Sequence, residues 1–287
     1  MKKFLVITIG AVFATATVRA DIAAYQTVVN SQNPAYYFNF DDSLTANVGS
    51  GTFGTAGSST GFTTDLSGNA NDALHVGNST SGYTLTTPNI INNAGSSTAV
   101  GSFSFLFNLA SAGGTQYFFS DSENTGTAPG SALALDFSGT LGFQFKVGNH
   151  SFVSATYLPA PVANTWYYFA ANWNFDGVPA DDTVNWWIGS VGGSLVAGNN
   201  TLVPYSSWAA GTTVGAGGTF DLGARSTLAS SSTGSYDELA TWSSQLTSDQ
   251  VNAQFNALTP APEPSSCAML GLGGLLVLWK RRAFRRD

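Results

Sequence analysis

The chain has 287 residues, of which 43% are hydrophobic and 13% aromatic, a composition too apolar for a disordered protein. Its net charge is −7, and between residues 21 and 266 only Lys146 and Arg225 oppose 16 acidic side chains, so this body repels phosphate backbones and nucleic acid is excluded as a partner. The single cysteine, Cys267, lies near the C-terminus, which excludes a cysteine-ligated zinc site and a thiol nucleophile from the body.

Residues 1–20 have the pattern of a secretory signal peptide. Two lysines at positions 2–3 precede an apolar stretch over residues 4–18, and a small-residue cleavage pattern ends at Ala20. We therefore expect signal peptidase to cut between Ala20 and Asp21, and the rest of the chain to be exported. The alternative is an uncleaved N-terminal anchor, which the shortness of the apolar stretch disfavours.

The body, residues 21–258, is dominated by strand patterns after a short helix expected over residues 21–29. Apolar and polar side chains alternate over residues 103–109, 133–137 and 141–147, which is typical of half-buried strands. Residues 166–173 and 184–188 are apolar on both faces and predict central strands. Clusters of Gly, Asn, Asp and Ser separate these runs, so we predict an all-β domain of two antiparallel sheets packed face to face.

The body is expected to end in a second short helix, near residues 248–258. Thr247 and Gln250, three residues apart, have the capping-box pattern of a helix N-terminus. One apolar stripe follows at helical spacing, formed by Val251, Phe255 and Leu258.

Residues 259–287 combine three features in a fixed order. Pro262, Glu263 and Pro264 come first, followed by an apolar run over residues 267–279 and a basic cluster over residues 280–286. The run is shorter than the ~20 residues that span a bilayer, but it can insert as a short transmembrane helix if the bilayer thins locally. The basic cluster would then stay on the cytoplasmic side, which places the acidic body on the other side.

This order resembles the PEP-CTERM sorting signal of Gram-negative bacteria. The resemblance implies that an exosortase processes the chain near Pro262, Glu263 and Pro264. It also implies transient anchoring by the C-terminal helix, then release toward the cell surface or extracellular polysaccharide. The alternative is a plain single-span tail anchor.

Four segments of the body resemble the concanavalin A-like lectin/glucanase superfamily in its laminin-G-like (LamG) form. They are residues 33–42 (NPAYYFNFDD), 65–74 (DLSGNANDAL), the pair 101–104 and 166–173, and 234–239 (GSYDEL) with Trp242 and the helix after it. The resemblance implies a jelly-roll β-sandwich over residues 21–258. It does not imply one function, because this fold carries both binding modules and enzymes.

Catalysis by the body is not expected. Glycoside hydrolysis needs two carboxyl groups flanking one sugar bond, and the body has only two glutamates before the sorting signal, Glu123 and Glu238. Asp237 and Glu238 are adjacent, so in a regular strand they point to opposite faces and cannot cooperate without a bulge. His75, and His150 in an expected turn, have no nucleophile motif nearby. An atypical glycoside hydrolase remains the alternative.

Calcium is the one cofactor that the sequence suggests, since Asp-rich loops supply the oxygen ligands that this cation prefers. LamG-like domains bind calcium at a sandwich edge, so the resemblance implies Asp65 and Asp237 as metal ligands. The alternative is that Asp65 only closes a turn and Asp237 makes a structural hydrogen bond.

A carbohydrate or matrix ligand is the expected partner of the exported body, which would then serve in adhesion. Sugar rings stack on exposed aromatic side chains, and the four tryptophans whose placement is open are Trp186, Trp187, Trp208 and Trp242. Most Trp and Phe side chains are expected to be core. A purely structural matrix component with no discrete ligand is the remaining alternative.

Overall fold

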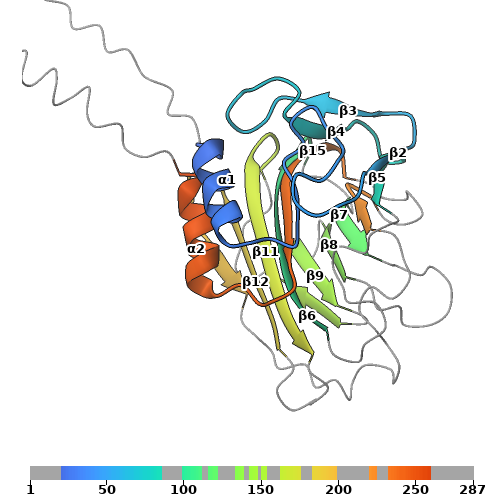
Figure 1. Cartoon of the computed structure of the whole chain (residues 1–287). Coiled ribbons are helices and arrows are strands. Elements are labelled where there is room, and N and C mark those ends of the chain that lie inside the picture. The colour runs from blue at the N-terminus through green and yellow to red at the C-terminus, as the bar shows by residue number, and fades with distance from the viewer. Residues whose placement is uncertain are drawn as a thin grey trace, which may run out of the picture.

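The computed structural model describes most of the body, which is largely β structure in two antiparallel sheets with few helices (Figure 1). The described residues are 21–85, 99–111, 116–121, 133–138, 142–147, 150–153, 162–175, 183–198, 220–224 and 232–259. The predicted two-sheet β architecture is confirmed. The expected signal helix and the C-terminal hydrophobic helix lie outside these ranges. Within the ranges, no helix has the length and apolar content that crossing a membrane requires.

The first sheet has eight strands and contains the longest ones. Its order is β13-β12-β11-β6-β15-β4-β3, and β1 pairs with β15 beside this path. The bounds are β1 Tyr36–Phe38, β3 Thr60–Thr63, β4 Ala73–Val76, β6 Ala99–Leu109, β11 Trp166–Phe175, β12 Thr183–Ser190, β13 Val196–Gly198 and β15 Gly234–Trp242. The last strand in sequence, β15, therefore lies in the interior of the sheet, between β6 and β4.

The second sheet has seven strands in the order β10-β9-β8-β7-β14-β5-β2. The bounds are β2 Gly54–Ala56, β5 Gly82–Leu85, β7 Gln116–Asp121, β8 Leu133–Ser138, β9 Gly142–Val147, β10 His150–Val153 and β14 Phe220–Leu222. His150 begins β10 and pairs with Val147, so the prediction that this residue lies in a turn is wrong.

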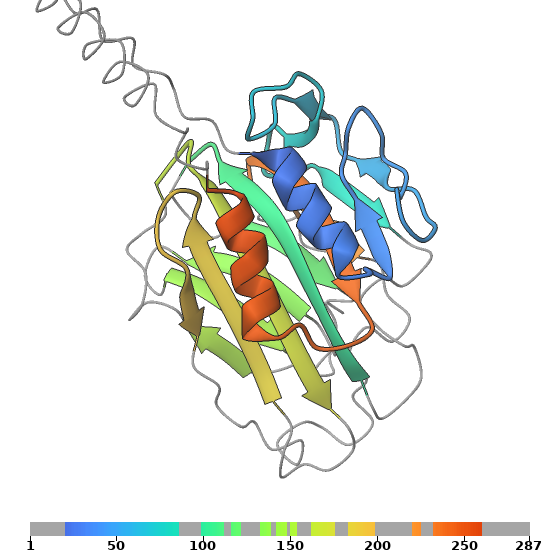
Figure 2. The ribbon, with the colours of Figure 1, turned by 60° about the vertical axis from the view of Figure 1, so that its left-hand side comes forward.

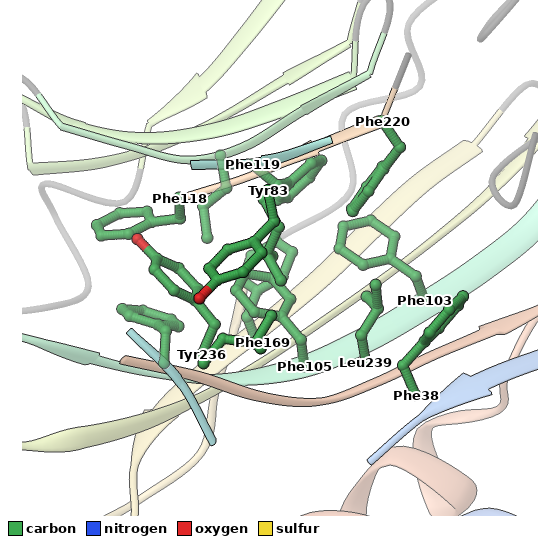
Figure 3. Close-up of a cluster of buried hydrophobic side chains, with 14 of the residues drawn as sticks. Phe38, Tyr83, Phe103, Phe105, Phe118, Phe119, Phe169, Phe220, Tyr236 and Leu239 are labelled. Atoms are coloured by element: carbon green, nitrogen blue, oxygen red, sulfur yellow. The ribbon is translucent and has the colours of Figure 1, made fainter. Parts of the chain in front are cut away.

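An aromatic core fills the space between the two sheets (Figure 3). Phe103, Phe105 and Phe107 alternate along β6 and are at most 1% exposed, which confirms the inward face predicted for this strand. The ring of Phe103 meets that of Phe119 from β7 edge-on, with 4.7 Å between the centroids. Such pairs add about 0.5–1.5 kcal/mol beyond the area they bury.

Two helices lie side by side on the outer face of the first sheet (Figure 2). Helix α1 spans Ile22–Ser31 and helix α2 spans Ser248–Ala257, so both expected helices of the body are confirmed. Asp21 caps α1 by accepting a hydrogen bond from the Ala24 amide, and Thr247 with Gln250 forms the predicted capping box of α2.

The helices change the environment of β6, which the sequence predicts to be half-buried. Ser102 and Ser104, on its polar face, are 1% and 0% exposed because the two helices cover that face. The Oγ of Ser102 donates to the Ser244 carbonyl (2.6 Å) and accepts from the Leu246 amide (3.1 Å). Small hydroxyl side chains thus let the segment that leads into α2 approach the strand closely.

Candidate functional site

A β-bulge in β15 places two adjacent carboxylates inside the protein. Asp237 pairs with Leu106 of β6 and Ala240 pairs with Ser104, so β15 holds one extra residue over this interval. Glu238 takes a left-handed backbone conformation there, with φ of 58°. The expectation that Asp237 and Glu238 point to opposite faces assumed a regular strand. Because β15 is bulged here, that expectation does not apply, and the side chains of Asp237 and Glu238 are 1% and 0% exposed.

Glu238 is held by hydrogen bonds from two other elements. The Tyr37 hydroxyl from β1 donates to Oε2, and Gln26 Nε2 from α1 donates to Oε1 at 2.8 Å. Burial raises the pKa of Glu238 from its ordinary 4.5 to about 8, although both hydrogen bonds act in the opposite direction. Sequence analysis did not assign Glu238 a binding role, because its burial depends on the bulge.

Asp237 has only one of its two carboxylate oxygens satisfied. Its Oδ1 accepts a hydrogen bond from the Glu238 amide at 2.9 Å, whereas its Oδ2 is buried without a hydrogen-bond partner among the described residues. Burial raises the pKa of Asp237 well above its usual range, and the charges of Glu238, Asp65 and Asp41 raise it further. An unpaired buried oxygen of this kind costs about 1–3 kcal/mol, and more when it is charged.

Asp65 closes the turn that the sequence pattern predicts. Its Oδ1 accepts from the Asn69 amide (2.7 Å), its Oδ2 from Asn69 Nδ2 (3.0 Å), and its carbonyl from the Gly68 amide (3.2 Å). This turn joins the segment after β1 through a bond from the Asp42 amide to the Asn71 carbonyl (2.8 Å). Asp65 therefore closes this turn, and its charge also raises the pKa values of Asp237 and Glu238.

The resulting acidic cluster comprises Asp41, Asp42, Asp65, Asp72, Asp237 and Glu238. Asp237, Glu238 and Asp65 are buried, Asp72 is half-buried, and Asp41 and Asp42 are exposed at the rim. The segments that supply them, residues 21–42, 65–72 and 234–242, contain no Lys, Arg or His. These segments therefore supply no positively charged side chain to balance the negative charge of the cluster.

The cluster fits a hard divalent cation in part. The orphaned Oδ2 of Asp237 is the kind of ligand that such an ion takes, and backbone carbonyls, Asn amides and waters supply others. In the described part of the chain, however, no three His, Cys, Asp or Glu side chains converge as a ready metal-binding group. A bound ion would complete its shell from backbone, amide and water oxygens.

The buried acids predict that stability without divalent cations falls as the pH rises. The raised pKa values mean that folded Glu238 and Asp237 keep protons that the unfolded chain releases. The stabilising contribution of Glu238 is full below about pH 4.5 and is lost as the pH rises toward about 8, and that of Asp237 is lost in the same direction. In a chelator, we expect the melting temperature to fall by several degrees between pH 5 and pH 8. Glu238→Gln should flatten this profile, and a wild-type profile that rises over the interval would contradict the expectation.

The other sequence-predicted sites do not gather here. Trp186, Trp187 and Trp242 are at most 7% exposed, so they are core residues and cannot offer a face for sugar stacking. His75 is half-buried in β4. The remaining candidates lie outside the described residues: Ala20, Glu123, Trp208, Pro262, Glu263 and Pro264.

The sandwich is similar to domains of known structure at low sequence identity. No protein-family model matches the chain, and no curated protein matches it. Domain 4 of AbnA, a GH43 extracellular arabinanase from Geobacillus stearothermophilus solved with arabinotriose, superposes with a TM-score of 0.50 and 18% identity over 77% of this chain and 98% of that domain. At these identities the similarity shows the fold alone.

Two larger proteins contain the same fold as a part. The binding domain of botulinum neurotoxin serotype D has a TM-score of 0.52 and 11% identity, over 80% of this chain and 52% of that one. A mutant of Trypanosoma rangeli sialidase that displays trans-sialidase activity gives the same TM-score and identity, over 85% of this chain and 36% of that one. The chain therefore spans about half and about a third of these two proteins.

Proposed function

We propose that this protein is an exported surface or matrix protein whose LamG-like, jelly-roll sandwich binds carbohydrate without cleaving it. The supporting observation is that the chain matches almost the whole of one isolated sandwich domain, domain 4 of AbnA, which was solved with arabinotriose. The terminal sequences support export through signal peptidase, with cleavage between Ala20 and Asp21. They also support sorting by an exosortase near Pro262, Glu263 and Pro264.

The geometry of the buried acid pair supports a binding role over hydrolysis. A glycosidase needs one carboxyl to reach the glycosidic oxygen and a second to face the anomeric carbon. Asp237 and Glu238 are 1% and 0% exposed, and Glu238 is already engaged by Gln26 of α1 and Tyr37 of β1. A sugar could reach this pair only if the elements that bury it moved.

The test is to offer the full chain arabinotriose and a broad glycan panel, measuring binding by calorimetry and release of reducing sugar in parallel. We expect saturable binding of at least one glycan class without sugar release. Catalytic release would establish the glycoside-hydrolase alternative. No binding to any glycan of the panel would favour the alternative of a purely structural matrix component.

We also propose that calcium binds at the acidic cluster, with Asp237 and Asp65 as its anchoring carboxylates. The buried, unpartnered Oδ2 of Asp237 supports this proposal, because a cation would satisfy that oxygen and offset the repulsion from Asp65 and Asp41. Calcium suits the cluster better than magnesium, since it accepts irregular shells of six to eight oxygens that include carbonyls. Its role would be structural, at the junction of β15, the Asp65 turn and α1.

A further inference from the structure

We propose that the carbohydrate-binding site lies on the outer face of the first sheet, in a row of four half-buried side chains, and takes a neutral oligosaccharide. This inference rests on the carbohydrate binding proposed above and gives it a location. The row crosses four neighbouring strands, β11, β6, β15 and β4. These four side chains form the outer row: Trp166, Asn108, Ser235 and His75.

The strand register brings the outer row together. Asn108 of β6 pairs with Trp166 of β11 on one side and with Ser235 of β15 on the other. Ser235 in turn pairs with His75 of β4. Three strand spacings of about 4.8 Å separate the two ends, so the row extends over about 14 Å and can contact more than one sugar ring. Each member alternates along its strand with a residue of the intersheet core and therefore points outward; these core residues are Tyr167, Phe107, Tyr236 and Leu74.

Helix α1 covers the neighbouring part of this face but begins short of the outer row (Figure 2). The Gln32 carbonyl at its C-terminal end accepts from the Trp242 indole (3.1 Å), at the end of β15 opposite to the row. The Tyr25 hydroxyl lies 3.3 Å from Ser104 Oγ, nearer to the row. The helix begins three residues before Tyr25, about 4.5 Å along its axis. Asn108 lies about 13 Å beyond Ser104 along the strand, so the helix does not reach it.

The polar groups of the outer row are not used to hold the fold. Among the described residues, the side chains of Asn108, Ser235 and His75 have no hydrogen-bond partner. Polar side chains under the helices on the same face differ, since Ser102 bonds the segment before α2 and Asn172 Nδ2 donates to the Leu246 carbonyl at 2.7 Å. The amide, hydroxyl and imidazole of the outer row are therefore available as donors and acceptors for sugar hydroxyl groups.

Trp166 supplies the apolar surface on which a sugar ring can stack. It packs against the hydrophobic cluster under the helices and still remains half-buried, so its ring is held in place while part of it meets solvent. The outer row contains no carboxylate, lysine or arginine. Between residues 21 and 266, 16 acidic side chains oppose two basic ones, so the body repels anionic glycans. These properties favour a neutral ligand.

Calorimetric titration of the full chain with arabinotriose and the other neutral oligosaccharides of the glycan panel tests the outer row. We expect Asn108→Ala and His75→Ala each to raise the dissociation constant about fivefold, the equivalent of one lost hydrogen bond. Trp166→Ala should raise it at least about tenfold. Trp166→Phe keeps an aromatic ring and should stay within about threefold of wild type.

Asn252→Ala is the matched control for Asn108→Ala, because Asn252 is an exposed amide on the outer surface of α2. It should leave the affinity within about twofold of wild type. The melting temperatures of Asn108→Ala and His75→Ala should equal that of wild type, since neither side chain holds the fold. Lost affinity at an unchanged melting temperature therefore identifies a contact with the ligand. A merely structural role would lower the melting temperature.

The outcomes separate the outer row from the proposed function. If wild type binds a neutral oligosaccharide and Asn108→Ala, His75→Ala and Trp166→Ala bind it equally well, the row is wrong and carbohydrate binding stands at another site. If wild type binds only anionic glycans, the neutral ligand is overturned. If wild type binds no glycan at all, the proposed function fails and the outer row with it.

Discussion

Replacing Phe105 with alanine should lower the free energy of unfolding by about 3–5 kcal/mol, the range observed when a fully buried Phe is truncated. Phe105 is 1% exposed at the centre of the intersheet core. Its ring lies 5.7 Å from that of Phe119 and 5.8 Å from that of Phe169, so it touches both sheets. Close-packed rings cannot collapse into the cavity that the substitution leaves.

Chemical denaturation of Phe105→Ala against wild type measures this loss. Val162→Ala is the control, because Val162 is 60% exposed and its hydrogen bond to the Tyr167 hydroxyl comes from the backbone amide, which the substitution keeps. The control should stay within about 0.5 kcal/mol of wild type. A loss below about 1 kcal/mol for Phe105→Ala would contradict a tightly packed intersheet core.

The stability advantage of Asp237→Asn over wild type should be present in chelator and should be lost in calcium. In chelator, we expect the variant to be more stable than wild type by about 1–3 kcal/mol near pH 8, because it no longer has to keep a buried carboxyl protonated at a pH where the unfolded chain ionises it. With calcium at 100 times its dissociation constant, wild type should gain about 2.7 kcal/mol, and the variant should gain little.

Thermal melting across a calcium titration gives both results from one experiment. Asp249→Asn is the matched control for removal of one negative charge, since Asp249 is an exposed residue in the first turn of α2. It should keep the calcium response of wild type. If calcium raises the melting temperature of Asp237→Asn as much as that of wild type, the ion binds elsewhere.

The two sheets were predictable because their signal is local and repeated. The period-two alternation along residues 103–109 gives the inward face of β6 directly, and the Thr247–Gln250 pair gives the start of α2. The burial of Ser102 and Ser104 was not predictable, since alternation cannot reveal that helices from both ends of the body cover the polar face. That coverage depends on contacts between residues far apart in sequence.

The acidic site was predictable only in its outline. Asp65 and Asp237 are singled out through a family resemblance, and the structure brings Asp65 near enough for its charge to raise the pKa of Asp237. Glu238 was missed because left-handed backbone is ordinarily signalled by Gly, Asn or Asp, and glutamate gives no such signal. The bulge follows from the register of β15 against β6, which is set by packing across the whole sheet.

The interior position of β15 has a consequence for folding during synthesis. Strands β4 and β6 are made early, but the strand that joins them is among the last to leave the ribosome. The nascent polypeptide consequently cannot complete the hydrogen-bonded ladder of the first sheet before almost the whole body has been synthesised. A chain that stops before residue 242 would lack part of this joining strand and could not close the sheet.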